Sequence, residues 1–529
     1  MIKALIAPMV LILGSCADIR LGIPPIRELY HEDAQRLARN PVIVIHGILG
    51  SRLVDRATGQ VVWGAFTKDA IDVTTPEGAR AFALDMDSRK PDRVVATGPV
   101  EKIDVDLLFG IISVDVYKQI LRALGVGGYT DSLTTPGYAE DHYTCHSFFY
   151  DWRLDNVQNA MALGAFISKT RAGIDLNART KVKSLRKEGT PAALASAVEL
   201  EAWLAAGYRF DIVAHSMGGL IARYFLRFGT EDLPLDGSLP KVSWAGAEEV
   251  DRLVMVGTPN LGSIEALEEL LNGMDLGLFL PSFDRSLLGS MPSIYQLLPR
   301  RSSRAFIDED GQPVDLDLFD VDLWESNQWG LLDPRCAESL EVLMPRVEEA
   351  EERRVLAREY LSWCLARAAQ FQGALDKDPE SECPVELRLF ASDTIRTKGI
   401  AILKGAPDGP KEACFVGPGT HLPGDGTVTR HSALGDRQFG TEARRDWLDT
   451  PIQWSSVTFL SDDHVGLTSN PQFTDNLLFY LLEQKPKRPA PNGKQAEPVS
   501  SHSTSLRPMQ RARLGPIKPS SPFRLGSFL

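Results

Sequence analysis

The chain has 529 residues, of which 43% are hydrophobic and 24% are charged, a balance typical of a globular protein with a large core. Its formal net charge of −13 at pH 7 argues against a general nucleic-acid binder, so we expect no nucleic acid among its partners. No apolar run reaches the roughly 18 residues that a membrane-spanning helix needs.

The N-terminal segment has the pattern of a secretory signal, in which Lys3 precedes an apolar run that gives way to small residues. The sequence Leu13-Gly-Ser-Cys16 also resembles a bacterial lipobox, whose Cys becomes the lipidated first residue of the mature protein. We therefore predict that residues 1–16 are a signal peptide and that Cys16 is lipidated. The protein would then be exported to the periplasm or cell envelope as a lipoprotein at a membrane surface. Signal cleavage without lipidation and a buried N-terminal helix are the alternatives.

The first predicted strand, residues 41–45, is a continuous β-branched run of the kind found in buried parallel strands. It ends in the Gly-rich turn His46-Gly-Ile-Leu-Gly50, whose backbone N–H groups suit one wall of an oxyanion hole. Residues 61–108 are rich in turn formers and predict a lid-like insertion, with a surface β-ribbon as the alternative. A helix over residues 113–124 and a strand over residues 143–149 follow.

The chain then reaches a strand–turn–helix pattern that contains a serine. A helix over residues 192–206 leads to the apolar run Ile212–Ala214, which stops at His215-Ser-Met-Gly-Gly219. An amphipathic segment with helical spacing follows at residues 220–227. This arrangement is typical of a nucleophile elbow, where the N-terminus of the helix favours developing negative charge. An ordinary turn that contains a serine is the alternative.

Beyond the elbow, further strands are expected at residues 250–257, 385–391 and 455–460, and a last helix at residues 473–482. The segment between the first two of these strands is largely helical and includes a long charged helix over residues 338–372, kinked near Pro345. Strands that alternate with helices predict an α/β fold, with a mostly parallel sheet and helices on both faces.

We expect the core in two parts, residues 38–263 and residues 383–484, separated by an inserted, mainly helical cap at residues 264–382. Residues 485–529 contain nine Lys or Arg against one acid, and they are rich in Pro and Ser, so we expect a disordered basic tail. Such a tail could contact anionic lipid or a wall polymer, or be a solvated linker.

Six cysteines are present, and Cys145 lies in an apolar run that predicts a buried thiol. If Cys16 carries lipid, the other four cysteines could form up to two disulfides, and their spacing does not select the pairs. They are Cys336, Cys364, Cys383 and Cys414. No Cys and His cluster has zinc spacing, so we expect no metal and no cofactor.

A nucleophilic serine needs a histidine to take its proton and a carboxylate to orient that histidine. In a sheet hydrolase, the acid and then the histidine follow the serine along the chain. His464 comes directly after the last expected strand, which is the required place. Asp425 lies in a Gly-flanked turn and is our candidate acid, with Asp393 as the second candidate and an ordinary Asp-Gly turn as the alternative.

These residues resemble the lecithin–cholesterol acyltransferase family of α/β-hydrolases, which includes phospholipid–diacylglycerol acyltransferases and related phospholipases. The similar segments run in family order over roughly residues 40–482, and the ordered set with Tyr-Asp-Trp-Arg is the specific part. They are His46-Gly-Ile-Leu-Gly50, Tyr150-Asp-Trp-Arg-Leu154, His215-Ser-Met-Gly-Gly219, Gly257-Thr-Pro-Asn-Leu-Gly-Ser263, Pro292-Ser-Ile-Tyr-Gln-Leu-Leu-Pro299, Gly424-Asp-Gly-Thr-Val428 and Asp463-His464.

The resemblance implies that Ser216 is the nucleophile, Asp425 the acid and His464 the base. It implies that the backbone amides of Leu49 and Met217 form the oxyanion hole. It further implies that four consecutive residues shape the wall of the substrate pocket. They are Tyr150, Asp151, Trp152 and Arg153.

Two residues depart from the family pattern, because His46 stands where many members have Pro and Ala214 stands where many have Gly. The cap and residues 61–108 match the family only in patches, which leaves the choice of substrate open.

We therefore expect a serine hydrolase or acyltransferase that acts on acyl esters of lipids through an acyl-enzyme, which passes the acyl group to water or to an alcohol. An esterase for a non-lipid ester is one alternative. A non-catalytic lipid- or wall-binding protein with the same fold is the other.

Overall fold

A computed structural model describes residues 30, 36–65, 71–86, 93–100, 114–134, 142–275, 282–406, 409–437, 448–489 and 491. The predicted signal peptide, the lipidation site Cys16 and most of the predicted basic tail lie outside the described residues. No helix in these ranges is long and apolar enough to cross a membrane.

A six-stranded parallel sheet forms the centre of the molecule, in the order β16-β11-β7-β6-β1-β5. Its strands are β1 (Val42–Ile45), β5 (Cys145–Phe148), β6 (Phe210–His215), β7 (Val250–Val256), β11 (Glu386–Ala391) and β16 (Trp454–Phe459). Each strand expected from the sequence is present, and every residue of β1, β6 and β7 is buried. The prediction of an α/β fold is confirmed.

Helices cover both faces of the sheet. Successive residues of a strand point to opposite faces, so each strand contributes side chains to two separate cores. On one face, Ile43 and Ile212 belong to a core shared with α4 (Asn156–Glu188) and α6 (Met217–Phe228). On the other face, Val44 belongs to a second core with α3 (Val114–Val126) and α14 (Pro471–Leu478). The chain leaves α14 through a π-helical turn, Phe479–Glu483.

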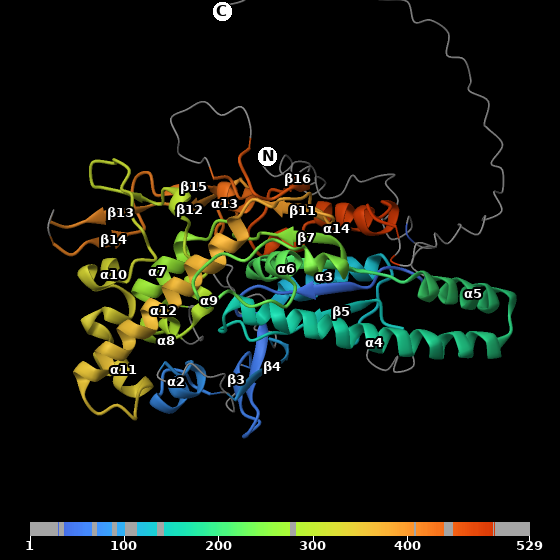
Figure 1. Cartoon of the computed structure of the whole chain (residues 1–529), viewed down its shortest axis with the longest axis horizontal. Helices are drawn as coiled ribbons and strands as arrows, with labels where there is room; N and C mark the ends of the chain where they lie inside the picture. The colour runs from blue at the N-terminus through green and yellow to red at the C-terminus, as the bar shows by residue number, and fades with distance from the viewer. Residues whose placement is uncertain are drawn as a thin grey trace, which may run out of the picture.

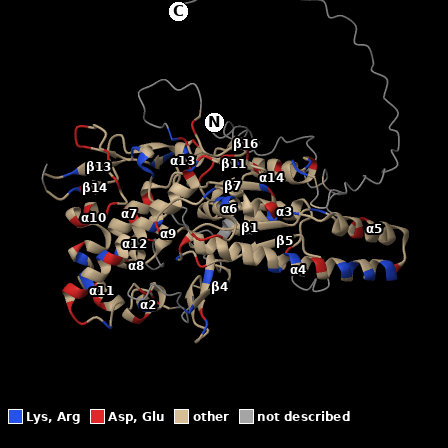
Figure 2. Ribbon diagram, viewed as in Figure 1, with Lys and Arg blue, Asp and Glu red and all other residues tan. Residues whose placement is uncertain are grey.

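Helix α4 also extends away from the sheet, where α5 (Pro191–Ala206) folds back along it (Figure 1). The two helices form an arm at one end of the molecule. Its exposed surface carries charges of both signs (Figure 2), and Arg186 pairs with Glu201 across it at 2.6 Å. The sequence pattern predicted α5 but not α4.

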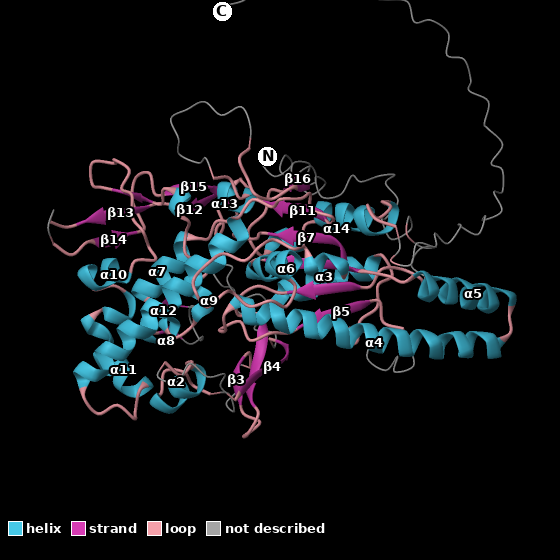
Figure 3. Ribbon diagram, in the orientation of Figure 1, coloured by secondary structure: helices cyan, strands magenta, loops and turns pink. Residues whose placement is uncertain are grey.

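A mainly helical block lies beyond the carboxyl ends of the parallel strands (Figure 3). It contains α7 (Ile264–Asn272), α8 (Arg285–Gly289), α9 (Pro292–Tyr295), α10 (Val321–Asn327), α11 (Ala337–Leu343) and α12 (Ala350–Asp376), with the short strands β8 (Met274–Asp275), β9 (Ser282–Phe283) and β10 (Phe306–Ile307). The prediction of one kinked helix near Pro345 is wrong. The chain instead forms two helices, since α11 ends before the proline, which cannot continue a helix.

The described part of the insertion after β1 contains a small antiparallel sheet and a helix. They are β2 (Ser51–Asp55), β3 (Val61–Trp63), β4 (Val94–Pro99) and α2 (Pro76–Phe82). Trp63 packs against Phe82 and against Trp152 of the main body, which fixes the insertion to the core.

A second antiparallel region lies between β11 and β16. It contains β12 (Ile395–Lys398) paired with β15 (His421–Gly424), β13 (Ala401–Lys404) paired with β14 (Glu412–Cys414), and α13 (Arg430–Leu434). Thr397 of β12 accepts a hydrogen bond from the Gly426 amide at 2.8 Å, so this region supports the loop that carries Asp425.

No disulfide joins any two of the five described cysteines, so none of the possible pairs forms among them. Cys145 is buried in β5, as its apolar surroundings predicted.

Candidate active site

Ser216 occupies a strained turn between β6 and α6, with φ 52° and ψ −128°. A non-Gly residue in this region is uncommon and is a feature of functional sites. The backbone at Gly218 lies close to the turn after β1, and only Gly fits there, because a Cβ on Gly218 would lie 2.5 Å from the carbonyl oxygen of His46. Ala214, two residues before Ser216, is fully buried in β6. The geometry is that of a nucleophile elbow, and with the parallel sheet it gives the α/β-hydrolase fold.

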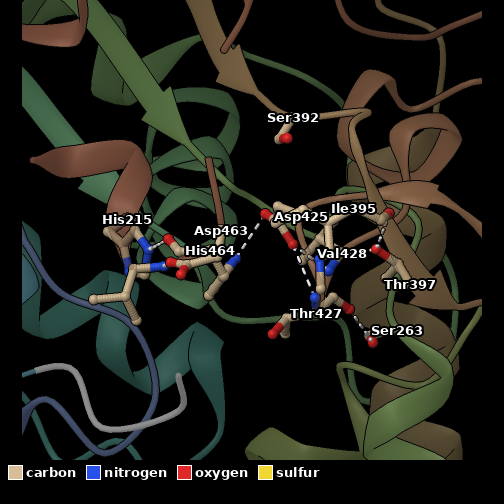
Figure 4. Close-up of polar contacts among 12 residues, drawn as sticks. His215, Ser263, Ser392, Ile395, Thr397, Asp425, Thr427, Val428, Asp463 and His464 are labelled. Carbon is tan, nitrogen blue, oxygen red and sulfur yellow. Dashed lines mark hydrogen bonds and ion pairs between the residues drawn. The ribbon is translucent and has the colours of Figure 1, made fainter. Parts of the chain in front are cut away.

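Asp425 and His464 are in contact, with Asp425 Oδ2 2.8 Å from His464 Nδ1 (Figure 4). The Thr427 and Val428 amides donate to Asp425 Oδ1 at 3.0 and 2.7 Å, so the carboxylate is fixed from the opposite side. The His464 amide donates to the Asp425 carbonyl at 2.8 Å. Asp393, the second candidate acid, instead pairs with Arg430 at 3.3 Å.

The position of Asp425 determines the protonation of His464. Burial opposes the imidazolium, but the charge and hydrogen bond of Asp425 outweigh it and raise the pKa of His464 above its ordinary value of 6.5. Since Asp425 accepts from Nδ1–H, the other ring nitrogen, Nε2, is the one available as a base.

His215 is a site residue that the sequence reasoning did not single out. Its Nε2 donates to the carbonyl oxygen of His464 at 3.0 Å, and the two ring centroids are 4.7 Å apart. Burial lowers the pKa of His215 to about 3, so the ring is neutral and acts as a support beneath His464. Its position directly before Ser216 was the feature of the sequence that could have identified it as a site residue.

Ser216 and His464 line one cleft at the carboxyl ends of the strands. Within the described residues, no hydrogen bond to the Ser216 hydroxyl or to His464 Nε2 is present, and both residues are buried. The rest of the lining is mostly apolar. It includes Ile48, Pro259, Ala266, Met274, Leu297, Val428 and Val465.

The turn after β1 lies beside the elbow, as an oxyanion wall requires. Ile48 lines the cleft, whereas Leu49 is buried with φ 64°, and its carbonyl accepts from Trp63 Nε1 at 2.9 Å. The Tyr150 hydroxyl donates to the His46 carbonyl at 2.8 Å and so holds the turn from below. The role of the Leu49 backbone amide as an oxyanion donor stays a prediction, and the backbone amide of Ile48 is a second candidate for that role.

The four residues predicted to form the pocket wall do not line the cleft. Tyr150, Asp151, Trp152 and Arg153 are all buried and none of them lines the cleft. Arg153 pairs with Asp151 at 2.7 Å and donates to the Phe82 carbonyl, so this segment joins the insertion to the core. The charged groups of Asp151 and Arg153 pair with each other, so this segment supports the site from behind the cleft.

Two acids that the sequence reasoning missed, Glu265 and Glu269 of α7, also line the cleft. Burial raises the pKa of Glu265 to about 7 and the pKa of Glu269 well above its ordinary value. No group of three or more metal-ligating side chains occurs in the described ranges.

The family model for lecithin:cholesterol acyltransferase matches residues 192–325. This segment therefore carries the family's sequence pattern. It includes β6, the elbow with Ser216 and helix α7, and it ends before Asp425 and His464. No curated protein matches the chain.

Solved structures similar to this chain include lipases and esterases. A Tle4–Tli4 complex gives 16% identity and a TM-score of 0.48, over 83% of this chain and 97% of the other. Lipase 1 from Pelosinus fermentans gives 13% identity and a TM-score of 0.29, over 85% and 100%. EstA from Clostridium botulinum gives 12% identity and a TM-score of 0.24, over 85% and 88%.

Proposed function

We propose that this chain, with its lecithin:cholesterol acyltransferase segment, is a serine hydrolase or acyltransferase that cleaves acyl esters of lipids. The observation that carries the proposal is the pairing of His464 with Asp425 in the cleft that also contains Ser216, on a strained elbow. A histidine oriented by a carboxylate and placed in one cleft with a serine is the arrangement that activates a nucleophile.

The reaction begins when the Ser216 hydroxyl oxygen attacks the ester carbonyl and His464 Nε2 takes the hydroxyl proton. Asp425 orients the ring and stabilises the imidazolium. The Met217 amide, at the start of α6, and the amide of Leu49 or Ile48 donate to the oxyanion. Each such donor contributes about 3–4 kcal/mol in comparable sites.

The tetrahedral intermediate then loses the alcohol, which leaves with the proton from His464, and the acyl group stays on Ser216 as an ester. Water or a second alcohol enters, gives its proton to His464 and attacks the acyl-enzyme. The acyl group departs as a free acid or a new ester, and Ser216 recovers its proton. The ratio of the two products depends on which acceptor reaches the cleft.

A lipid substrate fits the largely apolar lining of the cleft. Lipidation of Cys16 would place the enzyme at a membrane surface, where its substrates are found. Incorporation of labelled palmitate into the full chain tests this anchor, and a Cys16→Ala variant that still incorporates label would contradict it.

The catalytic proposal is tested with a fluorophosphonate probe, mapped by mass spectrometry with and without detergent. We expect an adduct on Ser216 that is lost in Ser216→Ala and in His464→Ala. A folded protein that forms no adduct in either condition would favour a lipid- or wall-binding role. Hydrolysis of soluble esters without any preference for longer acyl chains would favour the non-lipid esterase, and product analysis with an added alcohol separates hydrolysis from transfer.

A further inference from the structure

Two carbonyl groups of the turn after β1 point toward Tyr150, which is buried outside the cleft lining. The Tyr150 hydroxyl donates to the His46 carbonyl at 2.8 Å and to the Gly47 carbonyl at 3.2 Å. His46 Nδ1 lies 2.7 Å from the same Gly47 carbonyl oxygen. Because a carbonyl oxygen only accepts, Nδ1 carries the ring proton, and both lone pairs of the Gly47 oxygen are used. Two side chains therefore fix the direction of this carbonyl.

A third side chain fixes the His46 ring. Burial lowers the pKa of His46 to about 4, so the ring is neutral and Nε2 carries no proton. Nε2 therefore accepts from the Ser51 hydroxyl at 2.5 Å, and the Ser51 oxygen in turn accepts from the Tyr150 amide at 3.1 Å. The His46 and Tyr150 rings also stack, with centroids 4.4 Å apart and an angle of 5° between their planes. We call the side chains of His46, Ser51 and Tyr150 the carbonyl bracket.

The carbonyl bracket determines where the next backbone amide points. In a trans peptide the N–H lies opposite the C=O, and no cis peptide bond occurs in the described part of the chain. The Ile48 N–H therefore points away from the bracket. Gly47 and Ile48 both line the cleft, and within the described residues the Ile48 amide has no hydrogen-bond partner. Leu49 is buried outside the cleft lining, so Ile48 is the better placed of the two candidate donors.

The turn cannot fix this peptide by itself. A Cβ on Gly47 would lie 2.8 Å from the Cβ of Ser216, so the position requires Gly. Gly lets the neighbouring peptide planes rotate more freely than any other residue does. A buried carbonyl without a donor would also turn toward water in the cleft. Both effects would carry the Ile48 N–H away from Ser216, and the two donors of the bracket oppose them.

We propose that the carbonyl bracket positions the Ile48 amide as the second donor of the oxyanion hole, beside the Met217 amide. The proposal rests on the proposed ester cleavage at Ser216 and names the side chains that hold its oxyanion hole in place. None of the three lines the cleft, so they are positioning residues that act through the peptide between Gly47 and Ile48. Because the oxyanion develops in the transition state, loss of the bracket should lower kcat and leave KM nearly unchanged.

The test removes the two donors of the Gly47 carbonyl and measures hydrolysis of 4-nitrophenyl octanoate. Tyr150→Phe removes the hydroxyl and keeps the stacked ring, and His46→Phe removes both ring nitrogens and keeps an aromatic ring. Each should lower kcat about tenfold, because one donor remains. The double variant should lower kcat by about 10²–10³-fold, the loss that follows removal of an oxyanion donor. KM should change by less than about twofold in all three.

Tyr117→Phe is the matched control. Tyr117 is buried beside His46, with ring centroids 6.4 Å apart, but its hydroxyl has no hydrogen-bond partner among the described residues, so this variant should keep the wild-type kcat. Rates are counted per Ser216 labelled by fluorophosphonate at completion, so that unfolded protein does not contribute. Octylboronic acid forms a tetrahedral adduct with a nucleophilic serine, and its Ki should rise in proportion to the loss of kcat/KM.

The failures of the two proposals are distinguishable. Wild-type kcat and Ki in the double variant would overturn the carbonyl bracket and leave ester cleavage intact. A raised KM with unchanged kcat, or fewer labelled sites with unchanged kcat per site, would also overturn it, since these changes mean an altered pocket or a lower stability. Absence of turnover and of a Ser216 adduct in the wild-type protein would overturn ester cleavage and the bracket with it.

Discussion

Replacement of Asp425 by Asn tests the proposed mechanism most directly, because the structure dictates how the amide must lie. Two backbone amides, from Thr427 and Val428, donate to Asp425 Oδ1. An asparagine keeps these bonds only if its oxygen takes that position, which turns its NH₂ group toward His464 Nδ1. Nδ1 must then accept, so the proton of the neutral ring moves to Nε2. A protonated Nε2 cannot take the Ser216 proton.

We expect Asp425→Asn to lower kcat by about 10⁴-fold, the size of the effect when a triad carboxylate becomes an amide, which is about 5 kcal/mol of transition-state stabilisation. The acid limb of the pH–rate profile should move as well. Wild-type activity is lost as pH falls through the raised pKa of His464, and without the Asp425 charge this pKa falls, so the limb shifts to lower pH.

The assay is hydrolysis of an uncharged ester from pH 5 to 9, with the rate of fluorophosphonate labelling as a second readout. Asp393→Asn is the control, since Asp393 pairs with Arg430 and should leave the profile unchanged. A loss of less than tenfold in kcat, with the acid limb unmoved, would refute the role of Asp425.

Three further variants test the surroundings of the site. Gly218→Ala should lower stability by about 1–3 kcal/mol in thermal unfolding, because its Cβ would meet the His46 carbonyl. Arg153→Ala should cost about 3–5 kcal/mol in urea unfolding, because it leaves the buried Asp151 carboxylate unpaired. Met274→Trp should reduce kcat/KM for long acyl chains more than for short ones, because Met274 lines both the cleft and a second cavity next to it.

The glycine and arginine variants have matched control variants, and Met274→Trp is compared across acyl-chain lengths. Gly173→Ala, in the middle of α4 with open space around it, should be stabilising by up to about 1 kcal/mol. Arg301→Ala breaks an exposed pair with Asp315 and should cost less than about 1 kcal/mol. Equal losses in Arg153→Ala and Arg301→Ala, or equal effects of Met274→Trp on all chain lengths, would contradict the respective argument.

The sheet was predictable from the sequence because its strands are buried on both faces. A central strand such as Val42–Ile45 is apolar along its whole length, and a Gly-rich turn marks its end. Helix α4 was missed for the opposite reason. It has 33 residues, but its outer part extends beyond the sheet into solvent, so no single apolar stripe runs along it.

The site was predictable only where local chemistry fixes it. A strained serine turn needs small neighbours on either side, and chain order then limits the histidine to a few positions. Which carboxylate meets His464 depends on how β15 and β16 are placed in space, so the sequence favoured Asp425 but kept Asp393 as a second candidate until that placement was known. The wall assigned to Tyr150–Arg153 shows the same limit, because a sequence motif does not reveal which way its side chains face.

The distribution of these residues along the chain explains how chemistry and selection are separated. Ser216 directly follows β6, and His464 lies in the loop that follows β16. Glu265 and Glu269 instead lie on the first helix after β7, where the chain leaves the sheet for the helical block. A change in α7 can therefore alter the lining of the cleft while the strands that carry Ser216 and His464 stay in place. Substrate preference should accordingly respond to substitutions in α7 far more than the labelling of Ser216 does.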